Sequence, residues 1–139
     1  MTWGIDGSRR AIDKARAKAS HRADGAPPSF LVADALELSR LGLGFESVLD
    51  CGLFHTFDDR ARVRYVASLA AVVTPGGRLH LLCFSDREPD GWGPRRVTRS
   101  EIENTFADSW RVEAIEPERF ATRVSDAGAH AWLAIVERR

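Results

Sequence analysis

The stretch Trp3-Gly4-Ile5-Asp6-Gly7-Ser8 decides how the rest of the chain is interpreted. It has the pattern of a short buried strand that ends on an acidic residue, followed at once by a helix with Ser8 as its N-cap. In nucleotide-binding α/β folds, an acid at the end of a strand holds the ribose hydroxyls. Asp6, with Gly7 beside it, is therefore a candidate ribose ligand. The alternative is that Asp6 only caps the following helix.

Strand-like and helix-like segments alternate along the rest of the sequence. Short apolar runs of strand length are separated by segments with a helical period or by turn residues. The pattern predicts one domain over residues 1–139, of class α/β, with a doubly wound, mostly parallel, Rossmann-like sheet. The expected strands are 3–6, 30–34, 45–50, 79–84, 110–115 and 131–137, and the expected helices follow Ser8, Asp58 or Asp59, and Thr98.

Two boundary predictions and one pairing prediction complete this outline. The segment 24–28 (Asp-Gly-Ala-Pro-Pro) is expected to end the first helix, and 74–77 (Thr-Pro-Gly-Gly) the second. The last two apolar runs have no helix between them, so they are expected to pair as an antiparallel hairpin at one edge of the sheet.

Composition excludes several classes of protein. Twenty basic and twenty acidic residues cancel, which argues against a nucleic-acid-binding protein. No apolar run has the length of a membrane span, and the N-terminus lacks a signal-peptide pattern. Cys51 and Cys83 have no metal-ligand spacing and fall in strand-like segments. Reduced thiols in a cytoplasmic protein without a metal site are therefore expected.

In doubly wound sheets, ligands bind beyond the carboxyl ends of the strands. This rule selects Asp34, Ala35 and Leu36 after the second strand, and Cys51 and Gly52 after the third. The Asp34 carboxylate is suited to accept a hydrogen bond from an adenine amino group while Leu36 packs against the ring. Equally, Asp34 could cap the short turn that begins at Ala35.

His55 is the histidine that falls in a plausible cleft position. It is a candidate catalytic residue, because an imidazole can act as a general base near neutral pH. The alternative is a packed ring between Phe54 and Phe57, or an element of pocket shape. Phe54 itself is a candidate substrate contact.

The polar segment 85–97 is expected to be a loop. Glycines flank Trp92, and Arg95 and Arg96 follow closely. Such a loop could close over a substrate, with the arginines as donors for an anionic group. The alternative is an exposed connector with scattered arginines.

The ordered set of these residues resembles the class I methyltransferases that use S-adenosylmethionine. The resemblance rests on Asp6, on Asp34-Ala35-Leu36, on the run Phe45-Glu46-Ser47-Val48-Leu49-Asp50, and on the segment 69–79 with its Pro-Gly-Gly turn. It is closest in character to the small-molecule branch, similar to thiopurine and halide methyltransferases and to bacterial quinone or phenol O-methyltransferases. It covers the chain from Trp3 onward.

The resemblance implies a role for each candidate residue. Asp6 would bind the ribose of S-adenosylmethionine, Asp34 and Ala35 the adenine edge, and Cys51 and Gly52 would approach the methionine end. The methyl acceptor would be a small molecule, attacked in line at the methyl carbon. His55 would take the proton of a hydroxyl acceptor, whereas a thiol or halide would need no base.

One part of the family pattern has no counterpart before Trp3. The resemblance implies a first strand and a glycine-rich turn, which would lie between the strands that end at Asp6 and Asp50. The chain is therefore expected to be N-terminally truncated relative to the family. Three explanations stay open: a fragment, a sheet re-formed directly or with a strand from another copy in a homo-oligomer, and a non-catalytic module that acts by binding.

A nicotinamide dehydrogenase is the other enzyme class with an acid after its second strand. The short-chain type needs a tyrosine with a lysine four residues later. Tyr65 is followed at that distance by Leu69, and no lysine occurs after Lys18. The sequence therefore disfavours that class.

Overall fold

The first part of the chain is a small parallel unit. The computed structural model describes residues 1–21 and 26–139, so the helix-ending residues Asp24 and Gly25 lie outside the described residues. Strand β1 (Trp3–Asp6) pairs in parallel with β2 (Ser29–Val32), and helix α1 (Arg9–Ser20) connects them. The Ser8 side chain accepts a hydrogen bond from the Ala11 amide, which confirms the expected N-cap.

The middle of the chain supplies a second parallel pair. The 3₁₀ segment η1 (Ala35–Leu41) leads to β3 (Phe45–Cys51), and the short turn η2 (Phe54–Thr56) leads to helix α2 (Asp59–Ala70) and strand β4 (Val73–Phe84). Strand β4 pairs in parallel with β3. The helix and the two strands expected in this part of the chain are thus present, with the boundary between α2 and β4 corrected.

That correction concerns residues 74–77, which were expected to stop the second helix. Helix α2 ends at Ala70, and these residues lie inside β4. The Phe45 amide donates to the Val72 carbonyl at 2.7 Å, and Phe45 lies opposite Val73. Pairing with the start of β3 therefore draws Val73 and the Pro-Gly-Gly turn into the sheet.

The C-terminal part closes the sheet with the expected hairpin. Helix α3 (Arg99–Thr105) follows Thr98 as expected and begins with a capping box between Thr98 and Glu101. Strands β5 (Trp110–Phe120) and β6 (Ala129–Arg138) pair antiparallel and are longer than the sequence pattern indicated. Strand β6 lies between β4 and β5, so the order is β3-β4-β6-β5 and β5 forms the edge.

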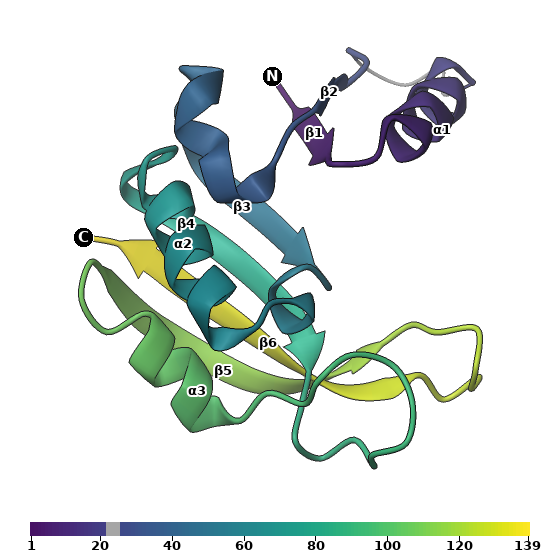
Figure 1. Ribbon diagram of the computed structural model, residues 1–139, viewed down its shortest axis with the longest axis vertical. Coiled ribbons are helices and arrows are strands. Elements are labelled where there is room, and N and C mark those ends of the chain that lie inside the picture. Colours follow the sequence, from purple (N-terminus) through teal and green to yellow (C-terminus); the bar gives the residue numbers. More distant parts are fainter. Residues whose placement is uncertain (22–25) are drawn as a thin grey trace.

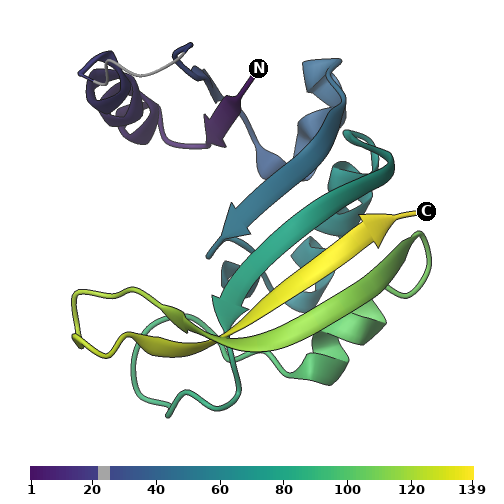
Figure 2. The same ribbon diagram turned by 180° about the vertical axis from the view of Figure 1, so that it is seen from behind.

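One face of this four-stranded sheet carries the core. Helices α2 and α3 cover that face, as the front and back views show (Figures 1 and 2). The core is made of residues that alternate along the strands and of the helix positions opposite them. Its fully buried large side chains include Phe54, Leu69, Leu79, Leu81, Ile102, Phe106 and Trp110.

The other face of the same sheet has no helix over it among the described residues (Figure 2). Leu49 on β3 is 72% exposed. Because cross-strand partners share a face, Leu49 stands in one row with His80 and Ile135, and Leu82 stands next to Leu133 in the neighbouring row. We call Leu49, Leu82, Leu133 and Ile135 the back-face patch.

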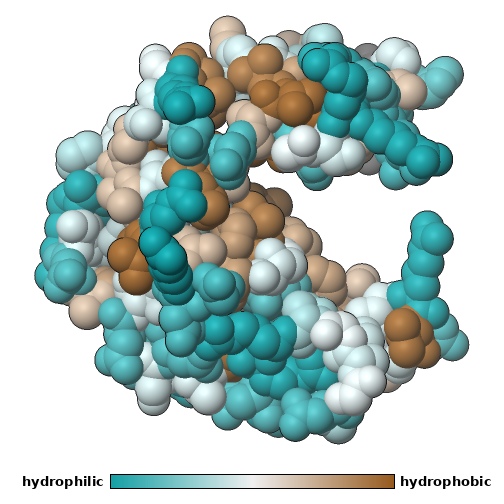
Figure 3. All heavy atoms as spheres, viewed as in Figure 1, coloured by the Kyte–Doolittle hydropathy of each residue, from teal (hydrophilic) through white to brown (hydrophobic). Residues whose placement is uncertain are grey.

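The sheet is divided between β1 and β3. The strands of the described residues form two sheets, β1-β2 and β3-β4-β6-β5, and no pairing joins β1 to β3. Figure 3 shows an open hollow between the β1–α1–β2 unit and the rest of the molecule. The α/β class and the Rossmann-like arrangement are confirmed, but β1 and β3 do not re-form a continuous sheet by direct pairing.

At this gap, the side on which the chain adds its next strand reverses. From β1 the chain steps outward to β2, and from β3 it steps outward the opposite way to β4. Parallel crossovers are right-handed, so the connecting helices α1 and α2 belong to opposite faces. A gap of this kind is a topological switch point, the place where open α/β sheets bind ligands at the strands' carboxyl ends.

Candidate functional site

Asp6 lies at the carboxyl end of β1 and is exposed to solvent. Its Oδ1 accepts a hydrogen bond from the Ser8 amide at 2.7 Å, while the Ser8 hydroxyl caps α1. The helix cap is thus Ser8 rather than Asp6. The second carboxylate oxygen of Asp6 has no protein partner among the described residues, and it remains available for a ligand hydroxyl.

Asp34 repeats this geometry beyond β2. Its Oδ1 accepts from the Leu36 amide at 2.8 Å, so Asp34 is the N-cap of η1. The side chains of Ala35 and Leu36 are half-buried against the core. The capping interpretation is therefore correct, and it leaves the other Asp34 oxygen and one side of Leu36 for a ring.

The turn after β3 is organised by Asp50, which sequence reasoning did not single out as a site residue. Its Oδ1 accepts from the Leu53 amide at 2.8 Å, and its Oδ2 from the Phe54 amide and the Tyr65 hydroxyl at 3.1 and 2.9 Å. Burial raises the pKa of Asp50, although these three hydrogen bonds act against the rise. The signal that could have found it is the acid at the strand end, as in Asp6 and Asp34.

Cys51 and Gly52 begin that turn. Cys51 is exposed, and Gly52 adopts a positive φ of 90°. A Cβ on Gly52 would stand 2.8 Å from the Phe120 ring and 3.3 Å from His55 Nε2. Only glycine therefore permits both this backbone conformation and this close packing.

His55 is buried where the ends of β3 and β4 meet. Its Nδ1 accepts a hydrogen bond from the Phe84 amide at 2.9 Å. Burial lowers the pKa of His55 to about 4, and the positive charges of Arg62 and Arg96 lower it further. The imidazole is neutral at pH 7, and its Nδ1 lone pair is already engaged, so the geometry does not favour the general-base interpretation.

Aromatic rings gather beside His55. Phe84 and Phe120 lie 5.0 and 5.7 Å from the imidazole centroid, and Trp92 lies 5.2 Å from Phe84. We call His55, Phe84, Trp92 and Phe120 the aromatic cluster. It packs at the carboxyl ends of β3 and β4, with His55 and Phe84 buried and Trp92 and Phe120 half-buried, and it includes two of the predicted residues, His55 and Trp92.

Phe54 was predicted to contact a substrate, but the structure places it in the core. Its side chain is fully buried, stacked 5.9 Å from Phe106 and covered by the Arg62 guanidinium at 4.3 Å. The following turn directs its ring beneath α3 while His55 faces the strand ends. This geometry therefore does not support Phe54 as a substrate contact.

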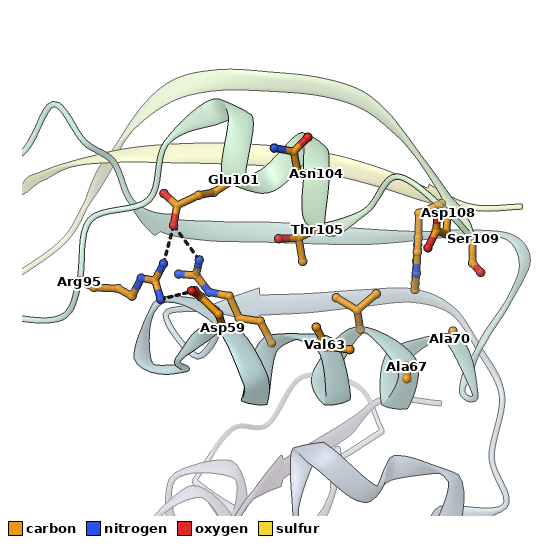
Figure 4. A pocket seen from close by; sticks show the side chains of 13 residues that line it. Asp59, Val63, Ala67, Ala70, Arg95, Glu101, Asn104, Thr105, Asp108 and Ser109 are labelled. Carbon is orange, nitrogen blue, oxygen red and sulfur yellow. Dashed lines mark hydrogen bonds and ion pairs between the residues drawn. The ribbon is translucent and has the colours of Figure 1, made fainter.

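Both arginines predicted as anion donors are engaged within the protein. Arg95 pairs with Asp59 and Glu101, at one end of a groove between α2 and α3 (Figure 4). Arg96 donates to four main-chain carbonyls of the 85–97 loop, those of Glu88, Pro89, Trp92 and Pro94. The two residues hold the loop in place rather than presenting free donors.

Glu101 links this loop to the helices. Burial acts to raise the pKa of Glu101, but hydrogen bonds from Thr98 and Arg95 outweigh it and lower the pKa to about 2. The same carboxylate pairs with the buried Arg62 at 3.1 Å. It therefore stays ionised and compensates a buried cation.

The structure thus brings some predicted residues together and separates others. Cys51, Gly52, His55 and Trp92 lie at the ends of β3 and β4, while Asp6 and Asp34 follow the ends of β1 and β2. Ala35 and Leu36 lead from Asp34 onto the core of the larger sheet. Within 1–21 and 26–139, no group of three His, Cys, Asp or Glu residues is placed to hold a metal ion. The helices of those ranges are also too short or too polar to cross a membrane.

A family model described as "Methyltransferase domain" matches residues 1–77 of this chain. The chain belongs to that family. Its fold is that of the class I S-adenosylmethionine-dependent methyltransferases, which confirms the resemblance found in the sequence. S-adenosylmethionine is the cofactor of this family.

Individual relatives agree with this assignment. The chain is 29% identical over 118 residues to 2-heptyl-1-hydroxyquinolin-4(1H)-one methyltransferase of Mycobacteroides abscessus, covering 84% of this chain and 52% of that protein. It is similar, at 30% identity and TM-score 0.83, to a structure described under the conversion of a disulfide bond into a thioacetal group during echinomycin biosynthesis, covering 98% and 65% of the two chains.

A more distant likeness concerns the fold alone. Magnesium protoporphyrin IX methyltransferase from Synechocystis PCC 6803, solved with bound SAM, has a TM-score of 0.72 at 19% identity, covering 99% of this chain and 59% of that one. The chain therefore spans between about half and two thirds of the length of these relatives.

Proposed function

We propose that this chain forms most of an S-adenosylmethionine-dependent methyltransferase that acts on a small molecule. The observation that carries the proposal is the placement of Asp6, Asp34 and the Cys51–Gly52 turn at the carboxyl ends of strands on both sides of one topological switch point. The relative from Mycobacteroides abscessus, a methyltransferase of a hydroxyquinolone, supports a small-molecule acceptor.

The described residues fit two of the three parts of S-adenosylmethionine. The free oxygen of Asp6 suits a ribose hydroxyl, and the free oxygen of Asp34 with the half-buried Leu36 suits the adenine. Cys51 and Gly52 provide a wall for the methionine end on the β3 side. No residue of the described chain stands in the gap to hold the methionine end from the β1 side.

We propose that a further parallel strand occupies the gap between β1 and β3 in the working enzyme. Both strands present unpaired amides and carbonyls toward the hollow, and such edges are stabilised by pairing. The length that the relatives have beyond the matched region is sufficient to supply one strand and its helix.

The helix that joins such a strand to β1 has a defined side. A right-handed crossover in this direction places it on the same face as α1, opposite α2. That is the face that carries the back-face patch, where Leu49 is 72% exposed beside the gap. One strand–helix unit would therefore pair both free edges and cover exposed apolar surface.

The chemistry assigned to the chain is positioning. When bound, S-adenosylmethionine would supply an electrophilic methyl group for transfer to the acceptor, with S-adenosylhomocysteine as the leaving group. Asp6 and Asp34 hold the nucleoside end, and the aromatic cluster excludes water and presents an apolar wall to a flat acceptor. The acceptor's proton passes to solvent.

Calorimetry with S-adenosylhomocysteine tests the proposal. The 139-residue chain is compared with a longer product read in frame from the DNA upstream of Met1, if that DNA encodes a strand and a glycine-rich turn. We expect the longer protein to bind the ligand and its Asp6→Asn variant to bind about tenfold or more weakly, because a charge-assisted hydrogen bond is lost.

Asp13→Asn is the matched control, because Asp13 is an exposed residue of α1 whose ion pair to Arg16 is at the surface. Its affinity is expected to equal that of the unmodified protein. Absence of heat and of a thermal shift in the longer protein would contradict the proposal and favour a non-catalytic binding module.

A further inference from the structure

The hydrogen-bond ladder between β3 and β4 ends in an unusual way. The Gly52 amide donates to the Leu82 carbonyl at 3.0 Å, which continues the parallel ladder. In a regular parallel pair, the next bond would run from the Phe84 amide back to the Gly52 carbonyl. At Gly52 the backbone takes a φ of 90° and leaves the sheet, so that bond is not made.

The His55 side chain takes the place of that carbonyl. The Phe84 amide donates to His55 Nδ1 at 2.9 Å, and Phe84 and His55 are both at most 5% exposed. Without this acceptor, a buried amide at the end of β4 would have no partner, at a cost of about 1–3 kcal/mol. Asp50 and Tyr65 hold the turn that delivers His55 to this position.

We propose that His55 is a positioning residue: its Nδ1 replaces a main-chain acceptor, locks the proton on Nε2, and fixes the turn after β3 against the end of β4. The bond joins the two halves of the site. Gly52 lies on the side assigned to the cofactor, and Phe84 belongs to the aromatic cluster on the side assigned to the acceptor.

The charges around the imidazole agree with this role. The positive charges of Arg62 on α2 and Arg96 in the 85–97 loop both oppose protonation of the ring, whereas the Gly52 backbone favours it. Strand β5 contributes the uncharged ring of Phe120. A proton added at Nδ1 would face the Phe84 amide hydrogen, so the interaction requires the neutral ring.

The inference concerns the site of the proposed function, but it does not rest on methyl transfer, and its test needs neither cofactor nor acceptor. In the unmodified protein, ¹⁵N spectra of the histidine rings are expected to show His55 with Nε2 protonated at pH 7 and with no titration between pH 8 and pH 5. A proton on Nδ1, or titration near the ordinary histidine pKa, would overturn the proposal.

Matched variants distinguish the contribution of the hydrogen-bond acceptor of His55 from that of its ring volume. In His55→Asn the side-chain Oδ1 occupies the position of Nδ1 and can accept from the Phe84 amide, whereas His55→Phe keeps the aromatic bulk without an acceptor. We expect hydrogen exchange of the Phe84 amide to be about tenfold or more faster in His55→Phe than in His55→Asn.

His55→Gln is the second comparison, because its amide lies at the Nε2 position and does not reach the Phe84 amide in the same way. It is expected to exchange like His55→Phe. Equal protection of the Phe84 amide in all three variants would overturn the proposal. If a variant does not fold, the ring spectra of the unmodified protein decide by themselves.

Discussion

At the scale of single residues, three acids lie at the ends of strands with similar local hydrogen bonds but differ in burial and in their other partners. Asp6, Asp34 and Asp50 each accept a main-chain hydrogen bond from a residue two or three positions later. Asp6 and Asp34 remain exposed with a free oxygen, whereas Asp50 is 4% exposed and saturated by Tyr65 and the following turn. Their local sequences do not distinguish them; the helix packed above Asp50 does.

Tyr65→Phe tests how much the hydrogen bond from Tyr65 to the buried Asp50 contributes to stability. The change removes the hydroxyl that donates to Asp50 and leaves a buried carboxylate oxygen with one donor fewer. We expect the free energy of unfolding to fall by about 1–3 kcal/mol, measured by urea denaturation. Val63→Ala on the same helix is the control, because Val63 is 71% exposed and its change should stay within about 0.5 kcal/mol.

At the scale of elements, the 85–97 loop is held by charge and hydrogen bonding rather than by an apolar anchor alone. Arg96 gathers the loop's carbonyls around one guanidinium, and Arg95 ties the loop to α2 and α3 through Asp59 and Glu101. A polar, glycine-rich sequence thus forms a fixed wall beside the aromatic cluster.

Arg96→Met should release this loop. The variant keeps much of the side-chain volume but loses every donor to the loop carbonyls. We expect amides of residues 86–96 to exchange about tenfold or more faster and limited proteolysis to cut there first. Arg87→Met, at an exposed position of the same loop, should leave exchange unchanged; equal loosening by both variants would contradict this role of Arg96.

The lowered pKa of Glu101 leads us to expect that the stability of the fold depends on pH. Its pKa is lowered in the folded protein to about 2 from the ordinary 4.5. Its stabilising contribution is therefore complete above about pH 4.5 and is lost as the pH falls toward about 2. The difference in melting temperature between the unmodified protein and Glu101→Gln should narrow across this window, whereas Glu103→Gln, an exposed change on α3, should show no such trend.

At the scale of the whole molecule, the divided sheet explains both the exposed apolar surface and the separated site residues. Among the described residues, β1 and β3 each keep one edge without a pairing strand, and the back-face patch beside that gap is uncovered. A second copy of the chain donating a strand is a further way to fill the gap, and size-exclusion chromatography of the 139-residue chain distinguishes it from a monomer.

The effect of Leu49→Glu on stability distinguishes the 139-residue chain from a longer protein in which a further strand and helix fill the gap. In the 139-residue chain Leu49 is 72% exposed, so the change should alter the free energy of unfolding by no more than about 0.5 kcal/mol. In a protein with a strand–helix unit over the gap, Leu49 would be buried and the cost should exceed about 2 kcal/mol. Val124→Glu, at an equally exposed position away from the gap, should be neutral in both. Equal effects of Leu49→Glu in the two proteins would contradict coverage of this face.

The sequence alone determined the order of elements, the helix caps and the acids at the strand ends. These features depend on local periodicity and on hydrogen bonds within three residues, as at Ser8, Asp58 and Thr98. It also placed the chain in its family, because the ordered strand-end residues are read directly along the chain.

Only the tertiary structure decided which of these residues stand free and which are already engaged. Phe54 and Arg95, predicted as substrate contacts, are bound to core and helix partners, and His55 accepts a main-chain amide 29 positions away. Such partners are distant in sequence, so no local pattern encodes them. Likewise, the gap beside β1 is visible only when strands pair, since an unpaired edge is a property of neighbours and not of the strand's own residues.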